Sequence, residues 1–108
     1  MFTITKNRSF TWPIRVLSPE SGERREIGEF NAYFRLLDLA ETNALGAQGD
    51  TAFLSAILVG WDGVVQEDGL AYPYTPEHLA TLIDFIPVRA ALLNAYHVAI
   101  SGGAREKN

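Results

Sequence analysis

The sequence contains no cysteine, only two histidines and no long hydrophobic run. The absence of cysteine excludes disulfides, thiolate catalysis and zinc sites with cysteine ligands. The apolar stretches are much shorter than the roughly 20 residues that a membrane helix needs. Residues 1–6 have no apolar run typical of a signal peptide. We therefore expect a cytoplasmic protein without a membrane partner.

Positive charge is also scarce, because 9 lysines and arginines stand against 13 aspartates and glutamates, for a net charge of -4. A mildly acidic surface repels phosphate backbones, so no nucleic-acid partner is expected. The 108 residues are 47% hydrophobic and 20% charged, which is typical of one globular domain. We predict a single domain over residues 1–108, with a β-hairpin region at 1–37, a helical region at 38–103 and a flexible tail at 104–108.

The N-terminal third has the period-two pattern of β-strands. Two runs alternate apolar and polar residues, one around residues 10–16 and one around residues 27–36, and a turn-rich stretch at 18–23 separates them. Pro13 places the first strand at a sheet edge, and Gly28 is suited to a bulge in the second. Phe2 and Ile4 are candidates for a short third strand.

The remainder has helical signals. Asp38 and Glu41 fit a capping box at the start of a short helix, and Asp50 is the expected cap of a second helix that ends at Gly60. A loop is predicted over residues 61–74. Thr75-Pro76-Glu77 then begins a third helix, Pro87 breaks or kinks the pattern, and a last helix continues until Gly102 and Gly103. The predicted fold class is α+β, an antiparallel hairpin with at most three strands followed by a bundle of three to four short helices.

Residues able to do chemistry are not grouped in any known catalytic or metal-binding pattern. His78 and His97 have no ligand partner at metal spacing, and we interpret both as surface histidines. A calcium loop starting at Asp62 fails because its third ligand position is Val64. The glycines match neither phosphate-binding motif, and Ser55 is not in a nucleophile elbow. We expect no catalytic residue, no metal and no cofactor.

Aromatic residues and an arginine indicate a candidate protein-interaction surface. Trp61 and Tyr74 belong to the predicted loop, while Arg89 and Tyr96 belong to the last helix, and these residue types are enriched at protein interfaces. The four residues are our candidates for protein interaction. For Trp61 we favour the alternative that it fills the core, because tryptophan buries roughly 150 Å² or more.

Several stretches of the sequence together resemble one protein family. The stretch 58–64 (LVGWDGV), the pair Asp68-Gly69, the stretch 72–77 (YPYTPE), the stretch 86–91 (IPVRAA) and the pair Ala95-Tyr96 are, in this order, similar to the tail assembly chaperones of long-tailed bacteriophages. Trp12-Pro13-Ile14 in the hairpin and the closing residues 104–108 also fit that family. The resemblance covers most of the chain, and residues 58–96 are its most specific part.

The resemblance implies a non-catalytic assembly factor in the bacterial cytoplasm. Such proteins coat the tape measure protein, help to recruit tail tube subunits, self-associate into oligomers or spirals, and are absent from the mature virion. The alanines of the last helix, namely Ala90, Ala91, Ala95 and Ala99, would let another helix approach closely, but we favour intramolecular packing as their explanation, because helix faces in a small domain are mostly core. Two alternatives are a tail-completion or head–tail joining subunit of the virion, and a small enzyme with a pocket under the 61–74 loop.

Overall fold

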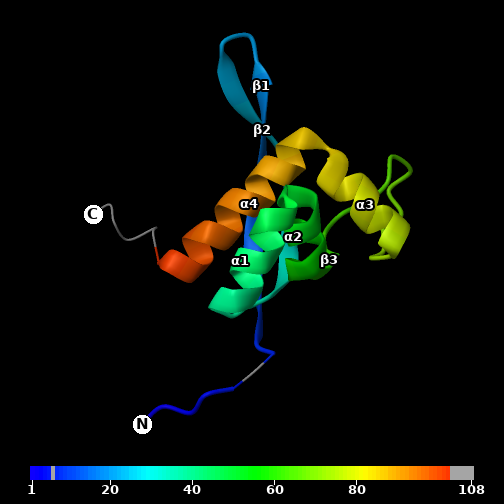
Figure 1. Cartoon of the computed structure of the whole chain (residues 1–108). Coiled ribbons are helices and arrows are strands. Elements are labelled where there is room, and N and C mark those ends of the chain that lie inside the picture. Colours follow the sequence, from blue (N-terminus) through cyan, green and yellow to red (C-terminus); the bar gives the residue numbers. More distant parts are fainter. Residues whose placement is uncertain (6, 103–108) are drawn as a thin grey trace.

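A computed structural model describes residues 1–5 and 7–102. In this part of the chain a three-stranded antiparallel sheet packs against four helices, which confirms the predicted α+β class (Figure 1). The elements are β1 (Ser9–Glu20), β2 (Glu23–Arg35), α1 (Leu39–Gln48), α2 (Asp50–Ile57), β3 (Leu58–Asp62), α3 (Pro76–Asp84) and α4 (Ile86–Ser101).

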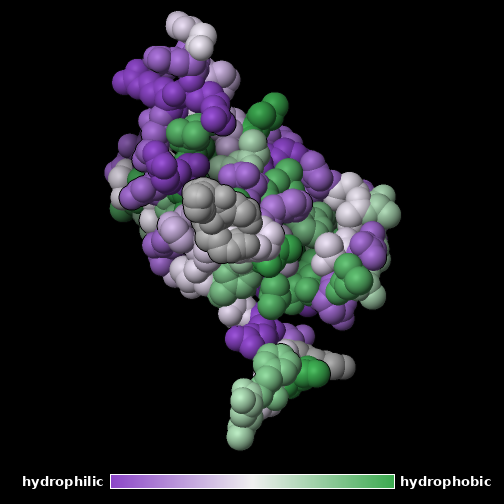
Figure 2. Space-filling view, turned by 90° about the vertical axis from the view of Figure 1, so that its left-hand side faces the viewer, coloured by the Kyte–Doolittle hydropathy of each residue, from purple (hydrophilic) through white to green (hydrophobic). Residues whose placement is uncertain are grey.

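The long β1–β2 hairpin agrees with the period-two pattern. The strand order is β1-β2-β3, so β1 lies at an edge, as the proline at position 13 requires. Ser21 and Gly22, both with positive φ, make the tight turn between the strands. The outer part of the hairpin is exposed and projects beyond the helices as a hydrophilic tip (Figures 1 and 2).

The expected bulge is present beside Gly28. Val16 lies opposite Gly28, whereas Leu17 lies opposite Glu26, so Ile27 is the extra residue on β2. The bulge shifts the register by one residue. Beyond it β2 is exposed on both faces, while Leu17 and the residue after it on β1 are half-buried.

The third strand does not come from Phe2 and Ile4, which belong to no strand. It is β3, which pairs with β2 so that Trp61 lies opposite Ala32. The predicted extension of the second helix to Gly60 is therefore wrong. The helix ends at Ile57 because the next residues gain more from pairing with β2 and burying their inward side chains than from one further helical turn.

Two of the three predicted helix caps are confirmed. Asp38 accepts a hydrogen bond from the Glu41 backbone at 2.8 Å, and the Glu41 side chain accepts one from the Asp38 backbone at 3.4 Å. Thr75 caps α3 by accepting from the backbone of His78 at 3.0 Å. The assignment of Asp50 as a cap is wrong, because Gly49 is the N-cap and Asp50 is the first residue of α2. There its carboxylate still faces the positive end of the helix dipole.

The chain turns sharply between α3 and α4. Phe85 ends one helix and precedes the next, and Pro87 lies in the first turn of α4, where its missing N–H costs nothing. Among the described residues no single helix is long and apolar enough to cross a membrane; the pair α3–α4 reaches that length and composition only together, with a bend of 94°. Gly102 ends α4 in the left-handed conformation, while Gly103 and the predicted tail at 104–108 lie outside the described residues.

One core joins the sheet to the helices. Its side chains come from the inward face of all three strands and from α2, α3 and α4, with α4 lying against β1. The largest completely buried side chains are Tyr96, Phe34, Ile14, Leu54, Ile57, Leu58 and Leu92. The predicted helical region, 38–103, therefore contributes a strand to the sheet as well.

Candidate functional site

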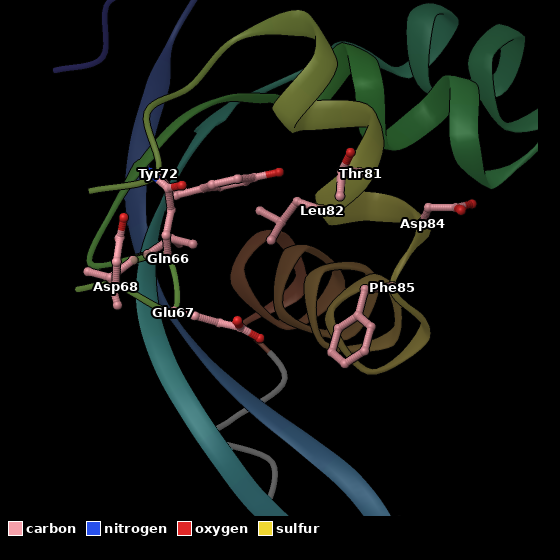
Figure 3. Close-up of a pocket in the computed structure, with 10 residues that line it drawn as sticks. Gln66, Glu67, Asp68, Tyr72, Thr81, Leu82, Asp84 and Phe85 are labelled. Atoms are coloured by element: carbon pink, nitrogen blue, oxygen red, sulfur yellow. The ribbon is translucent and has the colours of Figure 1, made fainter. Parts of the chain in front are cut away.

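An open hollow of about 1050 Å³ lies between the loop after β3 and the α3–α4 corner. It is larger than the roughly 300–1,000 Å³ of most small-molecule pockets and is open to solvent. Figure 3 shows Tyr72 and Glu67 pointing from the loop toward Leu82 and Phe85 on the other wall. Its residues are Val64, Val65, Gln66, Glu67, Asp68, Tyr72, Thr81, Leu82, Asp84 and Phe85.

The loop wall is held by its own hydrogen bonds. Val65 and Ala71 form an isolated bridge, and the Tyr72 N–H donates to the carbonyl of Val64 at 2.9 Å. The carboxylate of Asp68 accepts from the backbone of Leu70 at 2.9 Å and closes the turn. The loop is thus a small hairpin, which gives its exposed side chains fixed positions.

Trp61 and Tyr74 attach this loop to the sheet. The indole N–H of Trp61 donates to the carbonyl of Tyr72 at 2.7 Å, and the Tyr74 hydroxyl donates to the carbonyl of Leu58 at 3.3 Å. The ring of Tyr72 lies between two others, stacked on His78 at 3.9 Å and on Trp61 at 6.3 Å between ring centroids. These contacts fix the position of the loop, which forms one wall of the hollow.

Arg89 holds the opposite wall. Its guanidinium donates to the carbonyl of Ile83 at 3.1 Å and to the hydroxyl of Thr51 at 2.9 Å, so it ties the end of α3 to α2. The corner then presents Phe85, which is 51% exposed, and Ile86, which is still more exposed. Two large apolar residues next to each other in the sequence are thus exposed at this corner, and Phe85 lines the hollow.

The hollow combines apolar and acidic groups. Val65 is 61% exposed and Phe85 faces the same space, while Glu67, Asp68 and Asp84 supply three carboxylates. The described residues that line the hollow include no lysine or arginine. Such a surface attracts a segment that carries large apolar side chains next to positive charge.

The four residues predicted for protein interaction are not brought together as a surface. Trp61 is 7% exposed and Tyr96 is 1% exposed, so both are core residues. Tyr74 is partly exposed and Arg89 is intermediate, and each makes an internal hydrogen bond. Trp61, Tyr74 and Arg89 support the walls of the hollow, whereas Tyr96 lies in the core against the sheet.

The residues that sequence reasoning missed are the exposed apolar ones, Val65, Phe85 and Ile86. A signal for two of them was present, because Phe85 and Ile86 precede Pro87, and a proline-induced break leaves neighbouring side chains outside the helix pattern. Val65 had no comparable signal, because the 61–74 loop contains several other apolar residues and nothing in the sequence marks Val65 as the exposed one.

The acidic loop cluster considered for calcium is dispersed. Asp62 accepts hydrogen bonds from Asn31, at 3.1 Å, and from the hydroxyl of Tyr33 on the exposed face of the sheet. The bonds from Tyr33 and Asn31 lower the pKa of Asp62, and the bond to Asp62 raises the pKa of Tyr33. Within residues 1–5 and 7–102, no group of three histidine, aspartate or glutamate side chains is arranged to hold a metal ion.

The two histidines have different surroundings and different contacts. The Nδ1 atom of His78 lies 2.7 Å from the carbonyl of Pro73, and its ring stacks on Tyr72. His97 is exposed on α4, with its ring edge near Phe53. Each has a local structural contact that accounts for its place in the fold.

Three alanines of α4, namely Ala90, Ala91 and Ala95, line a second groove of about 590 Å³ against β1. Ala95 is buried in the core, Ala91 is partly buried and Ala90 is exposed. Intramolecular packing against β1 therefore accounts for the inner alanines, and the outer one borders the groove.

Comparison of the chain with models of protein families, with curated proteins and with solved structures found no match. The fold and the hollow therefore define an α+β domain with an open apolar and acidic surface, and its function is argued from that surface and from the sequence resemblance.

Proposed function

We propose that this protein is a non-catalytic tail assembly chaperone of a long-tailed phage or prophage. In this role it binds apolar segments of the tape measure protein in the bacterial cytoplasm and helps to recruit tail tube subunits. The resemblance of residues 58–96 suggests the family. The observation that carries the proposal is the open hollow, where exposed Val65 and Phe85 face solvent beside three carboxylates.

The chemistry of the hollow suits an unassembled helical client. A long protein that is waiting for its tube exposes apolar helix faces, and covering them prevents aggregation. The apolar walls would take such a face, while Glu67, Asp68 and Asp84 would attract lysines or arginines flanking it. Self-association would let several copies cover one long client.

The client interaction is tested with a double variant, Val65→Ser with Phe85→Ser. Both side chains are more than half exposed, so the change removes apolar contact area without opening the core. We expect retention of a co-expressed tape measure fragment in a pull-down to fall about tenfold or more. Leu39→Ser is the matched control, because Leu39 is an exposed leucine on α1 outside the hollow.

Circular dichroism and thermal unfolding first establish that the double variant is folded. Wild-type retention of the client by the folded double variant would remove the hollow from the binding site. Mass spectrometry of purified phage particles tests the role itself. An assembly chaperone is absent from them, and stoichiometric presence would instead identify a subunit of the virion.

A further inference from the structure

The first residues of the chain form a hydrophobic arm that leaves the body of the protein. Phe2 is 80% exposed and Ile4 is 79% exposed, and Thr3 and Thr5 alternate with them in a segment without regular secondary structure. Figure 2 shows these residues as a hydrophobic protrusion at the end opposite the hydrophilic hairpin tip. Large apolar residues that are exposed together, as Phe2 and Ile4 are here, mark an interaction surface more often than singly exposed ones do.

The arm has the chemistry that the hollow accepts. Phe2 and Ile4 are two large apolar residues with one residue between them, so a docked segment in extended conformation presents both on one side. The sequence continues with the basic residues Lys6 and Arg8. The hollow offers apolar walls and an acidic rim without a lysine or arginine among its described lining residues. Apolar and charge complementarity therefore match the arm to the hollow.

The strand register directs the loop of the hollow away from the arm. The arm joins β1 at Ser9, which lies opposite Arg35 at the last residue of β2. β3 runs from its partner Phe34 toward Asn31, and so delivers the loop of the hollow in the direction of the hairpin tip. Figure 1 shows the arm at the bottom and the loop beside α3 at the upper right. This separation favours the hollow of another molecule over the arm's own.

We propose that the arm of one copy, residues 1–5, docks in the hollow of a second copy. The contact joins two different surfaces, so each bound copy still offers one free arm and one free hollow. Contacts of this type add copies head to tail. The arm would occupy the hollow that the proposed function gives to the client, so the arm and the client compete for it. The inference itself needs only the arm and the hollow.

The first experiment measures mass against protein concentration by analytical ultracentrifugation. The wild-type average mass rises above one protomer with concentration, and it falls again at high salt because the charge attraction is screened. The arm variant, Phe2→Ser with Ile4→Ser, and the hollow variant, Glu67→Lys with Asp84→Lys, each associate about tenfold more weakly or not at all. A control variant, Ile27→Ser with Leu39→Ser, removes two exposed apolar residues elsewhere and associates as the wild type does.

The decisive experiment mixes the two defective variants. The arm variant keeps its hollow and the hollow variant keeps its arm, so together they form one contact and stop at a 1:1 pair. No association in this mixture, or wild-type association of the arm variant alone, overturns the proposal. A wild type that stays monomeric at every concentration also overturns it, including the case in which hydrogen exchange shows the loop protected by the arm of the same molecule. Client binding is not measured here, so this failure is separate from failure of the proposed function.

Discussion

Tyr33, Asn31 and Asp62 form a hydrogen-bonded group on the solvent face of the sheet, joining β2 to β3. The donated bonds lower the pKa of Asp62, chiefly through the Tyr33 hydroxyl. Tyr33→Phe removes that donor, so we predict that the pKa of Asp62 rises toward the ordinary aspartate value. Carboxyl carbon chemical shifts, followed through an NMR titration, measure this directly.

The same pair defines a pH window for stability. The lowered pKa of Asp62 gives stabilisation that is present above the unfolded value of about 3.9 and is lost as pH falls through the folded value. The raised pKa of Tyr33 gives stabilisation that is present below about 10 and is lost as pH rises through the folded value. In Tyr33→Phe both losses should shrink. An unchanged pKa of Asp62 in this variant would show that the hydroxyl does not act on the carboxylate.

The ring of Tyr33 leaves no room for a side chain at position 60, where the chain has glycine. A Cβ atom at position 60 would lie 2.8 Å from the Cδ2 atom of Tyr33, which faces it across the β2–β3 pair. The ring is held by its bond to Asp62, so Gly60→Ala must move the ring and weaken that bond. We predict a loss of about 1–3 kcal/mol in the free energy of unfolding, the usual range for overpacking.

A double-mutant cycle checks the cause. Gly60→Ala in a Tyr33→Ala background should cost clearly less, because the obstructing ring is absent. The free energy of unfolding is measured by urea unfolding in both backgrounds. If Gly60→Ala lowered it equally in both, the ring of Tyr33 would not be what the new methyl group collides with.

At the scale of elements, α1 depends on its cap more than the other helices do. None of its residues is fully buried, so packing contributes little, and the Asp38–Glu41 capping box begins the helix. We predict that Asp38→Ala destabilises α1 by about 1 kcal/mol, the typical value for loss of a side-chain cap. Amide hydrogen exchange should accelerate in residues 39–48 and much less in α4.

A matched change in α2 provides the control. Asp50→Ala removes an acidic residue from the first turn of a helix whose N-cap, Gly49, makes no side-chain bond. It should cost only about 0.3–1 kcal/mol through the helix dipole. A larger effect for Asp50 than for Asp38 would contradict the assignment of the two caps.

The elements that could be predicted from the sequence are those with local signals. The hairpin has period-two alternation, and α1 and α3 begin at residues whose own side chains make the cap. β3 could not be predicted in this way, because Leu58 continues the apolar spacing of α2. Its strand conformation comes from pairing with β2, more than twenty residues earlier in the sequence, and no local pattern encodes that partner.

The candidate site shows the same division. Trp61, Tyr74 and Arg89 were recognisable as residue types, but their inward hydrogen bonds depend on how the loop and the corner pack. The exposed partners that they position, Val65 and Phe85, are ordinary apolar residues in the sequence. Only the fold separates an exposed phenylalanine from a buried one.

At the scale of the whole molecule, Tyr96 joins the end of the sheet to the helices. Its hydroxyl accepts from the backbone N–H of Leu37 at 3.1 Å and donates to the carbonyl of Arg35 at 3.2 Å. Its ring packs against Phe34 on β2 and Phe53 on α2, with centroids 5.2 and 5.6 Å away. One side chain thus contacts the sheet, the connection to α1 and α2.

Tyr96→Phe keeps the ring and removes both hydrogen bonds. The buried N–H of Leu37 then has no acceptor, because water does not replace the hydroxyl in a packed core. We predict a loss of about 1–3 kcal/mol, the cost of an unsatisfied buried polar group. The loss should appear as one cooperative shift of the urea unfolding curve, with the same midpoint by fluorescence and by circular dichroism.

Tyr33→Phe is the natural comparison, since it removes the same hydroxyl from an exposed tyrosine whose partner stays hydrated. Its effect on stability at neutral pH should be the smaller of the two, because water can satisfy Asp62 but not the N–H of Leu37. If the two variants lost equal stability, burial would not be what makes the Tyr96 hydroxyl important. If the unfolding midpoints of Tyr96→Phe differed between fluorescence and circular dichroism, the sheet and the helices would unfold independently. The domain would then not be a single cooperative unit.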